Sequence, residues 1–121
     1  MSHLRWYNTK GFGEAAAKSH AYNQAVRVGE CIHFSALVNV DMNLRNAGGR
    51  GWAQVYKVRS YHIPLDEEAQ VAMVRNFRKW MPDHHALWTC VQVERLGADD
   101  MRVEIGVEAH DPEGGRRVLR A

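Results

Sequence analysis

The chain has 121 residues, 45% of them hydrophobic, which suits one folded domain with one core. Its 16 basic and 14 acidic residues leave a formal net charge of only +2, which argues against a nucleic-acid-binding surface. The segment Met1 to Glu14 has no continuous apolar run, so we expect neither a secretory signal nor a membrane span, and a cytoplasmic location. We also expect reduced thiols at Cys31 and Cys90.

The N-terminal half predicts a hairpin followed by a short helix. Residues 1–18 are expected to form an irregular arm, broken by glycines. Two apolar runs, His20 to Arg27 and Cys31 to Val38, are joined by a compact turn at Val28 to Glu30 and should pair as antiparallel strands. The apolar spacing from Val40 to Ala47 then predicts a short helix, which Gly48 and Gly49 end.

A strand and a longer helix are expected in the middle of the chain. Trp52 to Ile63 is rich in β-branched and aromatic residues, and Pro64 ends the run. Asp66 is a natural N-cap for a helix whose apolar residues recur at helical spacing until Pro82. Beyond the last strand, residues 111–121 are expected to be a flexible tail.

Residues 86–109 predict a closing β-hairpin, because two runs alternate with period two around a turn at Gly97 to Asp100. The expected register places one aliphatic face under the helices. It places Trp88, Cys90 and Glu104 together on the other face. Since tryptophan and cysteine prefer burial, we expect a second copy of the chain to cover that face and to form a pocket there.

Each candidate residue also has a structural interpretation. Glu104 is a mid-strand carboxylate that could act as an acid or base, or could simply pair with Gln92 or with a basic group of a neighbouring subunit. Cys90 lacks a local activating residue, so a small apolar filler is favoured over a nucleophile. Trp88 could stack on a ligand or anchor an interface. The histidines show no metal-ligand spacing, and no cofactor motif is present.

The order of these elements resembles one known family. The segments that carry the likeness are "YNQAVRVGECIHFSA", "NAGGRGWAQVYKVRSYHIPLDEE" and "TCVQVERLGADDMRVEIGVEAH". They resemble the RidA family, also called YjgF or L-PSP endoribonuclease-like proteins, and "RNFRKWMPDHHALWTCV" is similar to its fungal members. The resemblance implies a single α+β domain with a chorismate-mutase-like fold, in which a hairpin, helix, strand, helix and hairpin place the helices on one face of the sheet.

The resemblance also implies a homotrimer with small-molecule clefts between subunits, where reactive enamines or imines are hydrolysed. Tyr22 matches the family tyrosine, Cys90 its cysteine and Glu104 the glutamate that positions water. Trp88 occupies the position of the arginine that binds the substrate carboxylate, and an indole cannot form that bidentate pair. Ser35 and Ala36 match the cleft wall, although the segment after Ala36 is shorter than in the family.

Two hypotheses for function follow, and a third is disfavoured. The first is a Rid-type protein that binds, and with Glu104 hydrolyses or deaminates, a small imine, enamine or carbonyl metabolite without the family arginine. The second is a non-catalytic ligand-binding or partner protein derived from the same fold. A ribonuclease is disfavoured because the chain lacks a basic and aromatic groove for a nucleic-acid strand.

Overall fold

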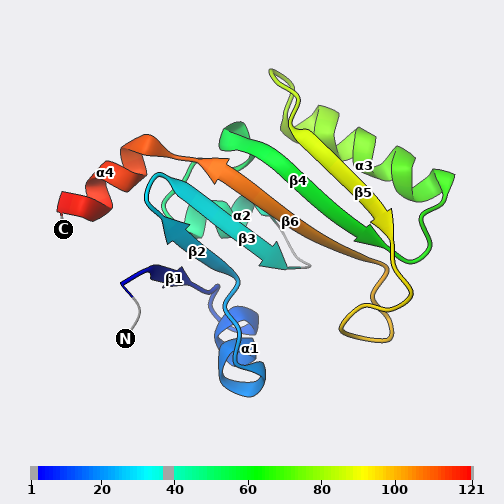
Figure 1. The fold of residues 1–121 in the computed structure, drawn as a ribbon, viewed down its shortest axis with the longest axis horizontal. Helices are drawn as coiled ribbons and strands as arrows, with labels where there is room; N and C mark the ends of the chain where they lie inside the picture. The colour runs from blue at the N-terminus through cyan, green and yellow to red at the C-terminus, as the bar shows by residue number, and fades with distance from the viewer. Residues whose placement is uncertain (1–2, 37–39, 121) are drawn as a thin grey trace.

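A computed structural model describes residues 3–36 and 40–120 of the chain (Figure 1). The elements in chain order are β1 Arg5–Tyr7, α1 Phe12–His20, β2 Ala25–Val28, β3 Cys31–Ala36, α2 Val40–Asn46, the 3-10 helix η1 Gly51–Gln54, β4 Val55–His62, α3 Glu67–Trp80, β5 Leu87–Gln92, β6 Val103–His110 and α4 Pro112–Arg120. No helix among these described residues is both long and apolar enough to cross a membrane.

The strands form one six-stranded sheet in the order β1-β2-β3-β6-β4-β5. All neighbouring strands are antiparallel except β4 and β5, which run parallel and are connected through α3. A parallel pair needs such a crossover connection, usually a helix. The expected α+β class is therefore confirmed.

The predicted hairpin of residues 86–109 is wrong. β4 lies between the two strands that were expected to pair, so β5 and β6 each pair with β4 and not with each other (Figure 1). Trp88 and Val107 both lie opposite Val58, which places all three on the same face of the sheet. Period-two alternation shows which residues of a strand share a face, but it does not show which strand lies next to it. Because β5 was expected to pair with β6 instead of β4, the prediction assigned its side chains to the wrong faces of the sheet.

The first hairpin is confirmed, with β2 and β3 antiparallel around Gly29, whose φ of +60° suits glycine. β2 begins only at Ala25, because α1 extends to His20. The prediction of an irregular arm is wrong for its described part, which contains β1 and most of α1. The tail was expected to be flexible but contains the helix α4. The shortened segment after Ala36 falls on residues 37–39, outside the described residues.

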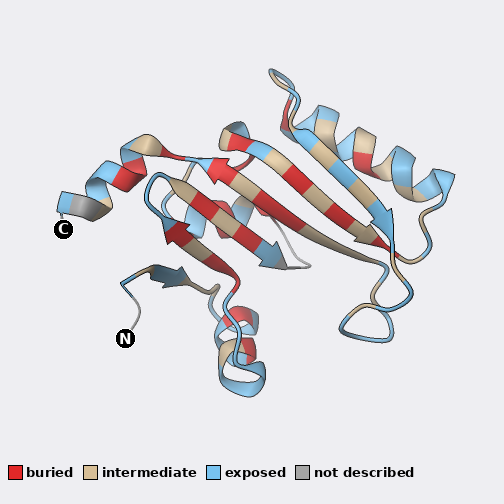
Figure 2. Cartoon of the chain, in the orientation of Figure 1, coloured by how far each residue is buried: buried red, intermediate tan, exposed pale blue. Residues whose placement is uncertain are grey.

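The core lies between the sheet and the helices α2 and α3, which pack on the same face. Asp66 caps α3 as expected, its side chain accepting a hydrogen bond from the backbone N–H of Ala69 at 2.9 Å. Figure 2 shows the alternation of buried and partly exposed residues along the central strands β3 and β4. The buried apolar cluster comprises Ala25, Ile32, Phe34, Val40, Leu44, Ala47, Trp52, Val55, Val58, Met73, Met81, Val107 and Ala109.

The opposite face of the sheet, here called the open face, has no helix of the described residues over it (Figure 1). By register it carries the side chains of Ser35, Arg59, Glu104 and Glu108. It also carries apolar side chains from β5, of which Leu87 is 69% exposed. Such a surface is incompletely covered in the single chain.

A buried ion pair joins the β2 strand to the start of α4. Arg27 and Asp111 are each 2% exposed at the side chain, and the Arg27 Nη2 atom lies 2.7 Å from Asp111 Oδ2. Asp111 also accepts hydrogen bonds from the Gln54 side chain at 3.0 Å and the Gly114 backbone N–H at 3.2 Å. Burial acts to raise the pKa of Asp111, but these hydrogen bonds and the charge of Arg27 hold it below the usual value of 3.8.

We predict that Asp111→Ala lowers the free energy of unfolding by about 3–5 kcal/mol, because Arg27 keeps a buried charge without its partner. Urea denaturation measures the loss, and Glu113→Gln, an exposed change in the adjoining helix α4, should have little effect. A carboxylate whose pKa is depressed by folding stabilises the protein above its unfolded pKa, and that contribution is lost as the pH falls through the folded value. The difference between wild type and Asp111→Asn should therefore shrink on acidification below 3.8; a constant difference would contradict this assignment.

Candidate functional site

The expected site residues divide between the two faces of the sheet. Trp88 and Cys90 lie on the helix-covered face, opposite Val58 and Ser60 of β4. Glu104 lies on the open face instead. The expectation that Trp88, Cys90 and Glu104 share one surface of a single chain is therefore wrong.

Of the other expected residues, the register places Ser35 on the open face. Ser35 pairs with Gly106 and is exposed there, and Ala36 pairs with Ile105. Tyr22 lies in the segment after α1 and is 44% exposed. Its only ring contact among the described residues is with His20, at 6.5 Å between centroids. These residues do not converge with Trp88 within one chain.

Trp88 is held rigidly between α3 and β4. Its ring meets Phe77 edge-on, with centroids 5.1 Å apart and planes at 84°. Its indole N–H donates to the Ser60 hydroxyl at 2.9 Å, and this oxygen also lies 2.8 Å from Nε2 of His62. Burial lowers the pKa of His62, so the neutral imidazole is favoured. The indole is thus positioned by both packing and hydrogen bonding.

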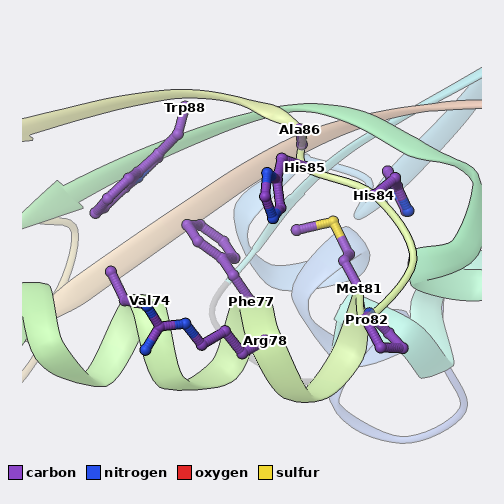
Figure 3. Close-up of a pocket in the computed structure, with 9 residues that line it drawn as sticks. All are labelled: Val74, Phe77, Arg78, Met81, Pro82, His84, His85, Ala86 and Trp88. Carbon is purple, nitrogen blue, oxygen red and sulfur yellow. The ribbon is translucent and has the colours of Figure 1, made fainter.

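Trp88 forms one wall of a cavity of about 480 Å³ between α3, β5 and the segment that joins them (Figure 3). We call this the Trp88 pocket; its lining residues are Val74, Phe77, Arg78, Met81, Pro82, His84, His85, Ala86 and Trp88. Figure 3 shows the His85 ring between the Phe77 and Met81 side chains. His84 is engaged elsewhere, since its Nε2 lies 2.8 Å from the Val55 carbonyl oxygen. The pocket therefore combines aromatic and aliphatic walls with Arg78 as its one permanent cation.

A network of polar side chains occupies the open face around Glu108. Its carboxylate accepts hydrogen bonds from Arg59 and from the Tyr56 hydroxyl, each at 3.1 Å, and lies 3.6 Å from Nδ1 of His33. Burial acts to raise the pKa of Glu108, but the donors and nearby cations hold it below its ordinary value. Burial, the contact with Cys31 and the hydrogen bond to Glu108 raise the pKa of Tyr56 to about 12.

Glu104 lies on the same face as this network, opposite Tyr61 and two residues from Gly106. The Arg59 side chain lies over Gly106, because a Cβ placed there would be 3.5 Å from its Nη2 atom. The expected partner Gln92 does not lie beside Glu104, because β4 separates their strands and Gln92, opposite His62, is on the helix-covered face. Among the described residues, Glu104 has no hydrogen bond or ion pair through its side chain. It therefore remains free to act on a molecule brought to this face.

Arg59 and Glu108 were missed by the sequence reasoning. Arg59 shares one face of β4 with Lys57 and Tyr61, so the period of two alone places it on the polar face of that strand. Its pairing with Glu108 depends on β4 and β6 being neighbours, which the sequence did not indicate. No group of three or more potential metal-ligating side chains occurs in the described part of the chain.

Comparison with solved structures identifies the fold. The protein YjgH aligns with a TM-score of 0.73 and 23% identity over 93% of this chain and 99% of its own. Yeast Mmf1 aligns with a TM-score of 0.71 and 19% identity, covering 89% and 98%. A Mycobacterium tuberculosis member of the YjgF/YER057c/UK114 family aligns with a TM-score of 0.69 and 18% identity, covering 88% and 98%. The chain thus has the fold of these proteins. No protein-family model and no curated protein sequence matches it.

We predict that Ser60→Ala destabilises the protein by about 1–3 kcal/mol, since the buried Trp88 N–H and the His62 ring nitrogen lose their common partner. Chemical denaturation followed by tryptophan fluorescence measures both the stability and the indole environment. Ser35→Ala on the exposed face is the matched control and should change neither. Equal stability of the two variants would show that the hydroxyl does not position the indole.

Proposed function

We propose that the protein binds a small metabolite with a reactive imine, enamine or carbonyl group and hydrolyses it at a site built from two copies of the chain. The supporting observation is the division of the expected residues between the two faces of the sheet. The Trp88 pocket lies on one side and Glu104 on the other, so the backbone of the sheet separates them within one chain. A second copy can bring its Glu104 to this pocket.

Self-association is supported by the uncovered apolar side chains. β5 is an edge strand, and Leu87 and Val91 on its open face are both exposed. An edge strand with exposed apolar residues is a surface that proteins cover by association. The family resemblance implies three copies, and a closed ring of three would give each pocket one neighbouring open face.

The proposed ligand carries an apolar side chain and an anionic group. Trp88, Phe77 and Met81 would contact the apolar part, since the pocket walls are largely aromatic and aliphatic. Arg78 lines the same pocket and forms no ion pair with another described residue, so its guanidinium can bind a carboxylate. Arg59 is less suited to this role because Glu108 already binds it. Arg78 would then replace the arginine that Trp88 displaced.

Hydrolysis of an imine requires a base and then an acid. The carboxylate of Glu104 would accept a proton from water as the water oxygen bonds to the carbon of the protonated imine, giving a neutral carbinolamine. Return of that proton to nitrogen makes ammonia the leaving group. As the C–N bond breaks, the Glu104 carboxylate would accept the hydroxyl proton, leaving a carbonyl compound and ammonia, and transfer of this proton to ammonia or solvent restores the carboxylate. No metal or redox partner is needed for this balance of atoms and charge.

We predict that Glu104→Gln lowers turnover of the imine roughly 10²–10⁴-fold, because the amide cannot accept the proton from water. The assay follows release of ammonia and of the carbonyl product from imines generated in solution. Light scattering should show an unchanged oligomer, and Glu94→Gln, an exposed change after β5, should retain full activity. Unchanged turnover in the Glu104 variant would remove the catalytic assignment.

We predict that Arg78→Gln and Trp88→Ala each raise KM about tenfold for imino acids with large apolar side chains. The chemical step should be less affected, since neither residue handles the proton. Arg75→Gln is the matched control, because Arg75 is exposed on α3 and does not line the pocket. If the control raises KM equally, the effect is one of general charge and the pocket is not the binding site.

A non-catalytic binding protein is the second candidate, favoured by Trp88 at the arginine position. A panel of imines and related carbonyl metabolites separates the two candidates, with thermal stabilisation and product formation measured on the same samples. Stabilisation that is lost in Trp88→Ala, with no product from any compound, would favour binding without catalysis.

A further inference from the structure

A second cavity, of about 250 Å³, lies at the other end of the sheet between β1, the end of α2 and α4. We call it the arginine cavity; it is lined by Arg5, Tyr7, Arg27, Asn46, Ala47, Gly48, Gly114, Arg117 and Val118. None of these residues lines the Trp88 pocket. The cavity wall thus includes three arginines and no acidic residue.

Two of these arginines face each other across a strand pair. Arg5 of β1 lies directly opposite Arg27 of β2, and like charges in this position destabilise a sheet. Asp111 neutralises Arg27. Arg5 has no hydrogen bond or ion pair through its side chain with any other described residue. One positive charge of this pair therefore remains uncompensated.

Arg117 supplies the third positive charge from α4. Its Nη2 donates to the carbonyl oxygen of Gly48 at 3.3 Å, which holds the side chain across the cavity wall. Its ion pair with Glu113 is long, at 3.7 Å, and the Arg117 and Glu113 side chains are 61% and 59% exposed. An exposed pair of this kind is weak. Arg117 thus remains available to an anion.

The atoms around the Arg27 side chain are closely packed. A Cβ on Gly114 would lie 2.8 Å from the Arg27 Nη2 atom and would also collide with the Asp111 carboxylate. Arg27 is only 3% exposed, and its Nε atom is buried without a hydrogen-bond partner in the described chain. The Arg27 guanidinium is therefore fixed, and Arg5 and Arg117 line the same cavity.

We infer that the arginine cavity binds the phosphoryl group of a small phosphate monoester. Asp111 cancels one of the three positive charges and the weak pair with Glu113 offsets part of a second, which leaves a net positive wall, and a phosphate monoester carries roughly −1.5 to −2 at neutral pH. Guanidinium groups bind phosphate oxygens through paired hydrogen bonds. The volume exceeds that of a few water molecules at about 30 Å³ each, so it also accommodates a short organic part beside Tyr7 and Val118.

Calorimetric titration of the full chain with glycerol 3-phosphate tests the inference, with inorganic phosphate, glycerol and sodium chloride at equal ionic strength as parallel arms. We expect saturable binding of the ester, weaker binding of inorganic phosphate and none of glycerol. Arg5→Gln and Arg117→Gln should each weaken binding of the ester about tenfold, which corresponds to about 1.4 kcal/mol. Both side chains are exposed, and Arg5→Gln removes a like charge opposite Arg27, so the thermal midpoints of the variants without ligand should not fall below that of the wild type.

Arg116→Gln is the matched control, because Arg116 is exposed on the same helix and does not line the cavity. Equal weakening in this variant would mean that net charge alone attracts the ester. Absence of saturable binding would overturn the site, and binding of inorganic phosphate without the ester would overturn the ligand class. None of these outcomes depends on the activity proposed for the Trp88 pocket.

Discussion

The position of β4 between β6 and β5 is the constraint on which the rest of the structure depends. Through its two registers it places Trp88 and Val107 on the face that packs against α2 and α3. The same registers turn Glu104 toward the open face. Since α3 connects β4 to β5 as a crossover, the parallel pair and the helix layer form one unit. The wall of the Trp88 pocket is a direct product of this arrangement, because its lining residues come from α3, from β5 and from the segment that joins them.

The two faces of the sheet have different physical characters, and this difference underlies the proposed function. The helix-covered face holds an aromatic pair, Trp88 against Phe77, in a partly buried position where one serine hydroxyl accepts the indole N–H. The open face holds carboxylates and a guanidinium, with Glu108 engaged and Glu104 free among the described residues. Apolar binding and proton transfer thus lie on opposite sides of one sheet. A site that uses both requires a second copy, which also covers the exposed side chains of β5.

Two carboxylates near the end of β6, the buried Asp111 and the partly buried Glu108, are stabilised in a similar way. Asp111 is surrounded by donors from Arg27, Gln54 and Gly114, and Glu108 by donors from Arg59 and Tyr56. In each case the hydrogen bonds outweigh the effect of burial on the pKa of the carboxyl group. The arginine cavity differs, because its wall carries more positive charge than the chain itself compensates.

The sequence by itself determined the local elements: the turn at Gly29, the N-cap at Asp66, the helix that follows it and the alternation along the last two strands. These features depend on backbone preferences and spacing within a few residues, which a sequence displays directly. Its resemblance to the RidA family also indicated the fold that the structural comparisons identify. Only the tertiary structure decided which strands are neighbours, and hence that Trp88 and Glu104 lie on opposite faces. It alone joined Arg5, Arg27 and Arg117 in one cavity, because strand order and helix docking are set by contacts between distant segments, which period-two and period-3.6 patterns do not specify.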